Sequence, residues 1–239
     1  MAQEILKFNN VIKNFAEKKV LQGIDLSVEA GEFFAFVGAN GQGKTTLMKG
    51  MLDFIQMDSG EIDIFGQSHL LTSARGSLAY LPERFNPPYF LTGRGFLQYI
   101  MKLHQRAYDE EAVLTMFSHL DLDPAALGNS VKSYSKGMTQ KLGLAGCFLS
   151  EKPLLLLDEP MSGLDPKARV LLKRQLLRMK ENGYSLFFST HLLADVEELC
   201  DRMAILHNGH LRFVGSPKDC RDQFGGKSLE ESFINCIES

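Results

Sequence analysis

The sequence lacks the features that would place the chain across a membrane or on a nucleic acid. It has no run of about 18 to 20 consecutive apolar residues, which a helix needs to cross a bilayer. Basic residues are not in excess, because 26 lysines and arginines stand against 29 aspartates and glutamates, for a net charge of −3. Dedicated nucleic-acid-binding proteins are usually basic. We therefore expect no nucleic acid among the partners.

Paired cysteines are also missing. Cys147, Cys200, Cys220 and Cys236 are widely separated and form no C-x-x-C pair, which disfavours a disulfide framework or a zinc site and suits a reduced, cytoplasmic setting. The N-terminus shows neither the basic region nor the apolar stretch of a signal peptide. With 44% hydrophobic residues in 239, the chain can bury one large α/β core.

The most specific segment is GANGQGKTT at 38–46, which fits the phosphate-binding pattern G-x-x-x-x-G-K-[ST]. An apolar run, FFAFV, precedes it and a helix-prone stretch follows, as this motif requires. Glycines let backbone N–H groups turn towards phosphates, and the start of a helix adds partial positive charge. Lys44 can reach the β- and γ-phosphates, and the Thr45 hydroxyl can ligate Mg²⁺. The predicted nucleotide-binding residues of this segment are Gly38, Asn40, Gly41, Gly43, Lys44, Thr45 and Thr46.

A second segment, LLLLDEP at 154–160, places two carboxylates at the end of a predicted strand. Four consecutive leucines indicate a strand buried on both faces, as in a parallel sheet. Open α/β sheets bind ligands at the carboxyl ends of their strands. There Asp158 would hold Mg²⁺ directly or through a water molecule, and Glu159 would orient and deprotonate the attacking water. Taken alone, such a pair is equally well explained as a strand end followed by a helix cap.

Three further segments complete a pattern. YSKGMTQ at 134–140 opens a predicted helix with Ser135 as its N-cap, SGLDP at 162–166 follows the acidic pair, and STH at 189–191 closes another apolar strand. With these five segments, in the family's order and at about its spacing, nearly the whole chain resembles the ATP-binding subunit of an ATP-binding-cassette (ABC) transporter.

The resemblance implies a fold, an activity and partners. The fold is of the α/β class: a P-loop NTPase, ABC ATPase core with an N-terminal β-subdomain and an inserted α-helical subdomain at about 85–150, all in one domain, 1–239. The implied cofactors are ATP and Mg²⁺, and the implied activity is ATP hydrolysis. The implied partners are a second copy of the chain, arranged head to tail, and transmembrane permease subunits. The chain would then sit on the cytoplasmic face of the inner or plasma membrane.

The resemblance also assigns roles to single residues. The segment at 134–138 is similar to the LSGGQ signature, so that Ser135 and Gly137 would contact the γ-phosphate of ATP held by the other copy. His191 resembles the family's switch histidine, which would contact the γ-phosphate, although without the resemblance a histidine at a strand end is more often structural. Phe15 falls near the aromatic residue that stacks on adenine, and an ordinary core phenylalanine is the equal alternative.

The chain departs from the family pattern at three positions. Lys136 replaces the first glycine of the signature and Met138 replaces its glutamine, while the serine and the second glycine remain. Glu83, in LAYLPE at 78–83, stands where the Q-loop has glutamine. A carboxylate there can still ligate Mg²⁺, but it adds negative charge beside phosphates. The YLPE and YSKGM forms together resemble the branch that drives drug, polysaccharide or lipid exporters.

Two questions stay open at the level of sequence. The aromatic stretch FNPPYF at 85–90 could contact a membrane subunit, as its place after the Q-loop implies, or fold back onto the core. The function could be the powering of an exporter, or that of a regulatory ABC-type ATPase that partners a membrane or division protein without moving a substrate. A GTP-dependent switch lacks support, because no N-K-x-D segment is present.

Overall fold

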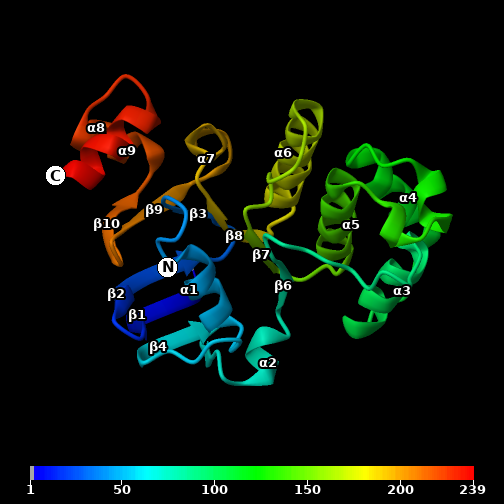
Figure 1. Cartoon of the computed structure of the whole chain (residues 1–239), viewed down its shortest axis with the longest axis horizontal. Helices are drawn as coiled ribbons and strands as arrows, with labels where there is room; N and C mark the ends of the chain where they lie inside the picture. Colours follow the sequence, from blue (N-terminus) through cyan, green and yellow to red (C-terminus); the bar gives the residue numbers. More distant parts are fainter. Residues whose placement is uncertain (1–2) are drawn as a thin grey trace.

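The computed structural model describes residues 3–239, which form two sheets flanked by helices (Figure 1). The first sheet is antiparallel and has the order β2-β1-β4-β5. Its strands are β1 (Glu4–Phe15), β2 (Lys18–Glu29), β4 (Ser59–Ile64) and β5 (Gln67–Ser68). The second sheet has the order β10-β9-β3-β8-β7-β6, and only the pairing of β10 with β9 is antiparallel in it. Its strands are β3 (Phe33–Val37), β6 (Leu78–Leu81), β7 (Leu154–Asp158), β8 (Ser185–Thr190), β9 (Arg202–His207) and β10 (His210–Gly215).

Helices lie between the strands and after the last of them. They are α1 (Lys44–Met51), α2 (Thr72–Arg75), α3 (Gly93–Leu103), α4 (Glu110–His119), α5 (Lys136–Leu149), α6 (Pro166–Glu181), α7 (Leu193–Leu199), α8 (Pro217–Phe224) and α9 (Leu229–Glu238). Between β6 and β7, helices α3 to α5 gather at one end of the molecule, away from the antiparallel sheet (Figure 1). The expected α/β class, with a β-rich N-terminal part and an inserted helical segment, is confirmed. Within residues 3–239, no helix combines the length and the apolarity that a bilayer span requires.

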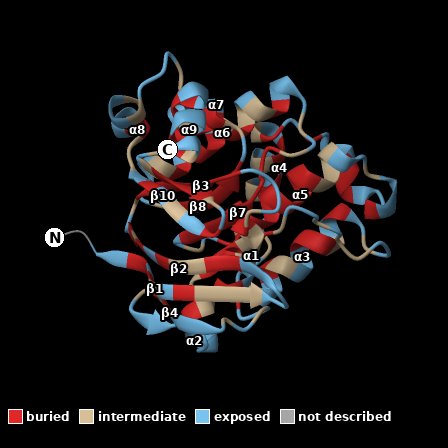
Figure 2. Ribbon diagram, turned by 60° about the vertical axis from the view of Figure 1, so that its left-hand side comes forward, coloured by how far each residue is buried: buried red, intermediate tan, exposed pale blue. Residues whose placement is uncertain are grey.

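The central strands of the mixed sheet are buried on both faces. Leu154 to Leu157 of β7 have no exposed surface, as the run of leucines predicted. Leu155 and Leu157 pack in a core with α5 and α6, whereas Leu154 and Leu156 pack in a second core with α1 and the antiparallel sheet. Figure 2 shows these strands as the buried centre of the protein. The end of β7 is therefore held from both sides.

Local sequence signals account for where several elements begin and end. The Ser135 hydroxyl accepts from the Met138 amide at 3.2 Å and caps α5. The Asp165 carboxylate accepts from the Ala168 amide at 2.9 Å and caps α6 in the same way. In the turn between β9 and β10, Asn208 and Gly209 both have positive φ, 49° and 80°, as the Asn-Gly pair predicts.

The aromatic stretch FNPPYF at 85–90 was predicted either to contact a membrane subunit or to fold back onto the core, and its residues differ in this respect. Phe85 folds back, and its ring packs edge-on against Phe96 with centroids 5.5 Å apart. A side chain at Gly143 would remove the space for it, because a Cβ there would lie 2.8 Å from Phe85 Cδ1. Tyr89 and Phe90, in contrast, are 70% and 74% exposed. Phe85 therefore follows the core-packing interpretation, being partly buried against the core, and the docking interpretation stays open for Tyr89 and Phe90.

Candidate functional site

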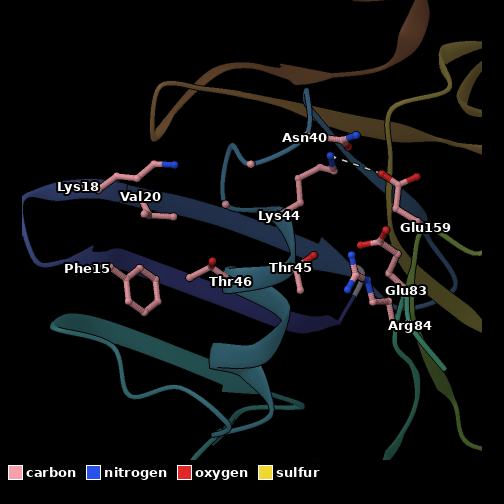
Figure 3. A pocket seen from close by; sticks show the side chains of 12 residues that line it. Phe15, Lys18, Val20, Asn40, Lys44, Thr45, Thr46, Glu83, Arg84 and Glu159 are labelled. Atoms are coloured by element: carbon pink, nitrogen blue, oxygen red, sulfur yellow. Dashed lines mark ion pairs between the residues drawn. The ribbon is translucent and has the colours of Figure 1, made fainter. Parts of the chain in front are cut away.

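The phosphate-binding loop borders a cavity of about 480 Å³ (Figure 3). The walls of the cavity come from the end of β1, the start of β2, the phosphate-binding loop, the start of α1, the segment after β6 and the residue after β7. The lining residues are Phe15, Lys18, Val20, Asn40, Gly41, Gly43, Lys44, Thr45, Thr46, Glu83, Arg84 and Glu159. Most of the predicted nucleotide-binding residues therefore meet in one place. Lys18, Val20 and Arg84 were not predicted, and no motif in the sequence marks them.

Glycines in the loop are required by close packing. A Cβ at Gly38 would lie 2.7 Å from the Leu206 carbonyl oxygen, and one at Gly43 would lie 2.9 Å from Val20 Cγ1. Gly43 also has a φ of +113°, which side chains disfavour. The loop therefore lies directly against β2 and β9. It leads into the first turn of α1, whose free N–H groups and partial positive charge favour phosphate.

Lys44 is held over the loop. Its side chain is buried, and its Nζ donates to the carbonyl oxygens of Gly38 at 2.6 Å and Ala39 at 3.2 Å. The same Nζ lies 3.5 Å from Glu159 Oε1, the pair marked in Figure 3. The lysine is thus placed between the loop and the acidic pair. A phosphate anion bound at the loop would meet this positive charge.

A serine on the neighbouring strand organises the acidic pair. In the parallel register, Ser189 of β8 lies beside Asp158 of β7. The Ser189 hydroxyl donates to Asp158 Oδ1 at 2.5 Å and accepts from the Glu159 amide at 3.0 Å. Ser189 has no exposed surface. The sequence interpretation assigned it no role in the site, although its place two residues before His191 was a usable signal.

Glu159 has a constrained backbone and one exposed neighbour. Its φ of +49° falls in the left-handed region, which is uncommon for any residue except glycine and is concentrated at functional sites. Its Oε2 lies 2.9 Å from Nδ1 of His191, whose side chain is 48% exposed. The structure therefore brings together the predicted general base, Glu159, and the predicted switch histidine, although they are 32 positions apart.

The oxygen donors present suit a magnesium–nucleotide complex. Asp158 Oδ2 and Glu159 Oε1 are buried and have no hydrogen-bond partner within residues 3–239. Buried carboxylate oxygens normally have partners, so Asp158 Oδ2 is available to a ligand, whereas Glu159 Oε1 already faces the Lys44 ammonium group at 3.5 Å. Mg²⁺ prefers oxygen ligands from one or two carboxylates together with phosphates and water. Asp158, Thr45 and Glu83 supply such oxygens, and Lys44 supplies a charge for the phosphates.

The signature segment does not reach this cavity. Ser135 is exposed at the start of α5, Gly137 is partly exposed, and neither lines the cavity described above. The helix that it opens, α5, instead contacts the residue that follows the acidic pair, because Gln140 Nε2 donates to the Pro160 carbonyl oxygen at 3.1 Å. A Cβ on Gly137 would lie 3.4 Å from the Gly163 carbonyl oxygen. Within one chain, the two predicted phosphate-binding elements are therefore separate.

Comparison with known families gives a match to the ABC transporter description over residues 21–162. The chain belongs to the ABC transporter family of ATP-binding proteins. Members of this family bind and hydrolyse ATP. The phosphate-binding loop and the acidic pair both fall within the matched residues.

Relatives of the chain carry ABC transporter names. It is 33% identical to the uncharacterised ABC transporter ATP-binding protein YhcH of Bacillus subtilis over 223 residues, 90% of this chain and 71% of the relative. It is 39% identical over 199 residues to an uncharacterised ABC transporter ATP-binding protein of Synechocystis, covering 82% of this chain and 56% of that protein. The chain thus spans just over half the length of the Synechocystis relative. The bacitracin transport ATP-binding protein BcrA of Enterococcus faecalis is 33% identical over 87% of this chain and 68% of its own length.

Solved ABC structures share the fold. The ATP-binding subunit of an ABC transporter superposes with a TM-score of 0.88 at 31% identity, covering 97% of this chain and 99% of that one. A bacterial Atm1-family ABC exporter with ATP bound has a TM-score of 0.81 at 22% identity, over 98% of this chain and 42% of that one, and shows the fold alone. The predicted P-loop NTPase fold of the ABC type is confirmed.

Phe15, predicted as the adenine-stacking residue of this ABC protein, lies at the edge of the cavity. It is 45% exposed, so it is no ordinary core residue. Lys13 Nζ lies 5.2 Å from the centroid of its ring. The exposed ring offers a flat apolar surface at the mouth of the cavity (Figure 3).

Proposed function

We propose that the chain is the ATP-binding and ATP-hydrolysing subunit of an ABC exporter, acting as a head-to-tail pair with a second copy. In this proposal residues 1–239 act as one ATP-binding domain, on membrane subunits at the cytoplasmic face. The observation that carries it is the separation of the signature from the loop: Lys44 and Glu159 line one cavity, while Ser135 and Gly137 lie outside that cavity, exposed and partly exposed. Pairing two copies head to tail would let each signature complete the other's site.

The chemistry follows from the side chains around the cavity. Water attacks the γ-phosphorus and the bond to the β–γ bridging oxygen breaks, while Glu159 takes the proton of the water. Lys44 offsets the charge of the β- and γ-phosphates. His191, which is partly exposed, orients the Glu159 carboxylate through the contact between its Nδ1 and Glu159 Oε2. Thr45 and Asp158, with Glu83 as a further oxygen donor, would hold Mg²⁺. The cation supplies neutralisation of the phosphate charge.

Relatives support an exporter rather than an importer. One is named for bacitracin transport, and another is the Nod factor export ATP-binding protein I of Rhizobium etli, 29% identical over 239 residues. The exposed aromatic pair Tyr89 and Phe90, just beyond β6, supplies a surface on which a membrane subunit could dock.

Replacing Glu159 with glutamine tests the proposal. Glu159→Gln keeps the shape of the side chain and loses the base, so hydrolysis should fall by about 10²–10⁴-fold. One negative charge near the γ-phosphate is also lost, so ATP should stay bound and the paired form should accumulate. The measurements are phosphate release, and size-exclusion chromatography with Mg-ATP at high protein concentration, repeated with the co-purified membrane partner.

Glu230→Gln, an exposed glutamate in the first turn of α9, is the matched control and should behave as the wild type. An unchanged hydrolysis rate in Glu159→Gln would show that Glu159 is not the base. An inactive variant that stays monomeric in both settings would refute the composite site.

A further inference from the structure

Tyr80 carries a buried hydroxyl group that nothing in residues 3–239 satisfies. It lies on β6, and its ring packs edge-on against Phe54 with centroids 6.3 Å apart. A buried hydroxyl normally has a hydrogen-bond partner, and leaving it unpaired costs free energy. Phenylalanine would fill the same space without that cost. We therefore expect the Tyr80 hydroxyl to have a hydrogen-bond partner that does not belong to the chain.

The sheet places a second unpaired group beside it. In the parallel register of β6 and β7, Tyr80 lies beside Leu156, and Asp158 follows two positions later on β7. Residues two apart on a strand share a face. Tyr80 and Leu156 both pack in the core that contains α1, so Tyr80 and Asp158 lie on the sheet face that packs against α1. Asp158 Oδ2 is also buried and unpaired.

Electrostatics at Tyr80 keep its hydroxyl neutral. Burial, and then the negative charges of Asp158 and Glu83, raise the pKa of Tyr80 far above its ordinary value. The group thus retains its proton and can both donate and accept a hydrogen bond. A water molecule bound to a cation turns its oxygen to the cation and its protons outward. The Tyr80 hydroxyl oxygen can accept one of those protons, and Asp158 Oδ2 is a further buried acceptor on the same sheet face.

We propose that Tyr80 is a further binding residue of the Mg²⁺·ATP site, where its hydroxyl hydrogen-bonds to a water ligand of the cation held at Asp158. This role rests on the proposed function, because it needs Mg²⁺ at Asp158. It assigns a purpose to two unpaired buried groups at once. Tyr80 would also differ from residues that contact the nucleotide itself, because its contribution to nucleotide affinity would require the cation.

The test is isothermal titration calorimetry of the full chain with the non-hydrolysable analogue AMP-PNP, once with Mg²⁺ and once with EDTA. Tyr80→Phe removes only the hydroxyl. Its affinity should fall by roughly three- to tenfold with Mg²⁺, as for one lost hydrogen bond, and should equal that of the wild type in EDTA. Tyr108→Phe is the matched control, because the Tyr108 hydroxyl donates to Glu110 at 2.8 Å in the helical segment. It should change neither affinity.

Unfolding of the ligand-free protein, followed by circular dichroism because the chain has no tryptophan, provides a second readout. Tyr80→Phe should leave the midpoint unchanged or higher, since an unpaired hydroxyl is removed. A lower midpoint would mean that the hydroxyl serves the ligand-free fold through a structural water, which overturns the proposal. An equal loss of affinity with EDTA overturns it too, as does an unchanged affinity with Mg²⁺ while the wild type depends on Mg²⁺. If AMP-PNP binding by the wild type is independent of Mg²⁺, the proposed metal site itself fails.

Discussion

The nucleotide-facing core and the helical segment between β6 and β7 present their predicted functional residues differently. In the core, Lys44 and His191 both contact Glu159, on a scaffold of strands buried on both faces. In the helical segment, Ser135 is exposed at the end of a helix and Phe90 is 74% exposed. Lys44 and Glu159 are desolvated and held by the core, where electrostatic interactions are strong, and of these three residues only His191 is exposed. Residues that are predicted to contact another molecule, such as Ser135 and Phe90, are instead exposed at the surface.

Four tests could break or sharpen this comparison, and the Lys44→Ala variant should have the largest effect. It removes the charge held 3.5 Å from Glu159 and facing the loop, so hydrolysis should fall by at least about 10²–10³-fold, as for the loss of one preorganised electrostatic group. Phosphate release measures it. Lys49→Ala, an exposed lysine on the same helix, is the control and should retain activity. Near-normal hydrolysis in Lys44→Ala would mean that the lysine of the phosphate-binding loop takes no part in ATP hydrolysis.

His191→Ala should have the second largest effect. The histidine contacts Glu159 at 2.9 Å, and a hydrogen bond to a charged group contributes about 1.5–3 kcal/mol, or roughly 10- to 150-fold in rate. Turnover should fall by that factor with little change in the dissociation constant for ATP. Steady-state kinetics with calorimetry separates the two, and His210→Ala, an exposed histidine of β10, is the control. An equal loss of ATP affinity would make His191 a structural residue.

Gly137→Ala tests the helical segment directly. A Cβ there would lie 3.4 Å from the Gly163 carbonyl oxygen, an ordinary contact, and alanine favours a helix. The fold and ATP binding by the single chain should therefore be unchanged. Hydrolysis should drop by about tenfold if the methyl group hinders the approach of the other copy's phosphate by about 1.4 kcal/mol. Full activity would mean that Gly137 does not face a phosphate.

The smallest effect on the isolated chain should come from replacing both Tyr89 and Phe90 with serine. Both are exposed, so the free energy of unfolding should change by less than about 0.5 kcal/mol, while co-purification with a membrane partner should be lost. Phe85→Ser should do the reverse and cost about 2 kcal/mol of stability, since Phe85 packs against Phe96 in the core. Thermal unfolding and pull-down from mild detergent measure both. Retained assembly in the double variant would remove the docking role.

Much of the fold could be predicted from local patterns. Helix starts at Ser135 and Asp165, the Asn-Gly turn after β9 and the buried leucine strand depend on interactions within a few residues, which the sequence displays directly. The phosphate-binding loop is equally local, because Gly38 to Thr46 form one continuous segment. The roles of Ser135 and Gly137 stay predictions, since they concern a second molecule.

The sequence by itself determined the family, the fold class and the identity of the residues around the loop and the acidic pair. Only the tertiary structure decided which of them meet. Ser189 reaches Asp158, and His191 reaches Glu159, because β8 lies beside β7 in the sheet, although each pair is separated by more than thirty positions. Strand order depends on the packing of whole faces and not on any short segment. For the same reason, neither the buried hydroxyl of Tyr80 nor the inward turn of Phe85 could be read from its neighbours in the chain.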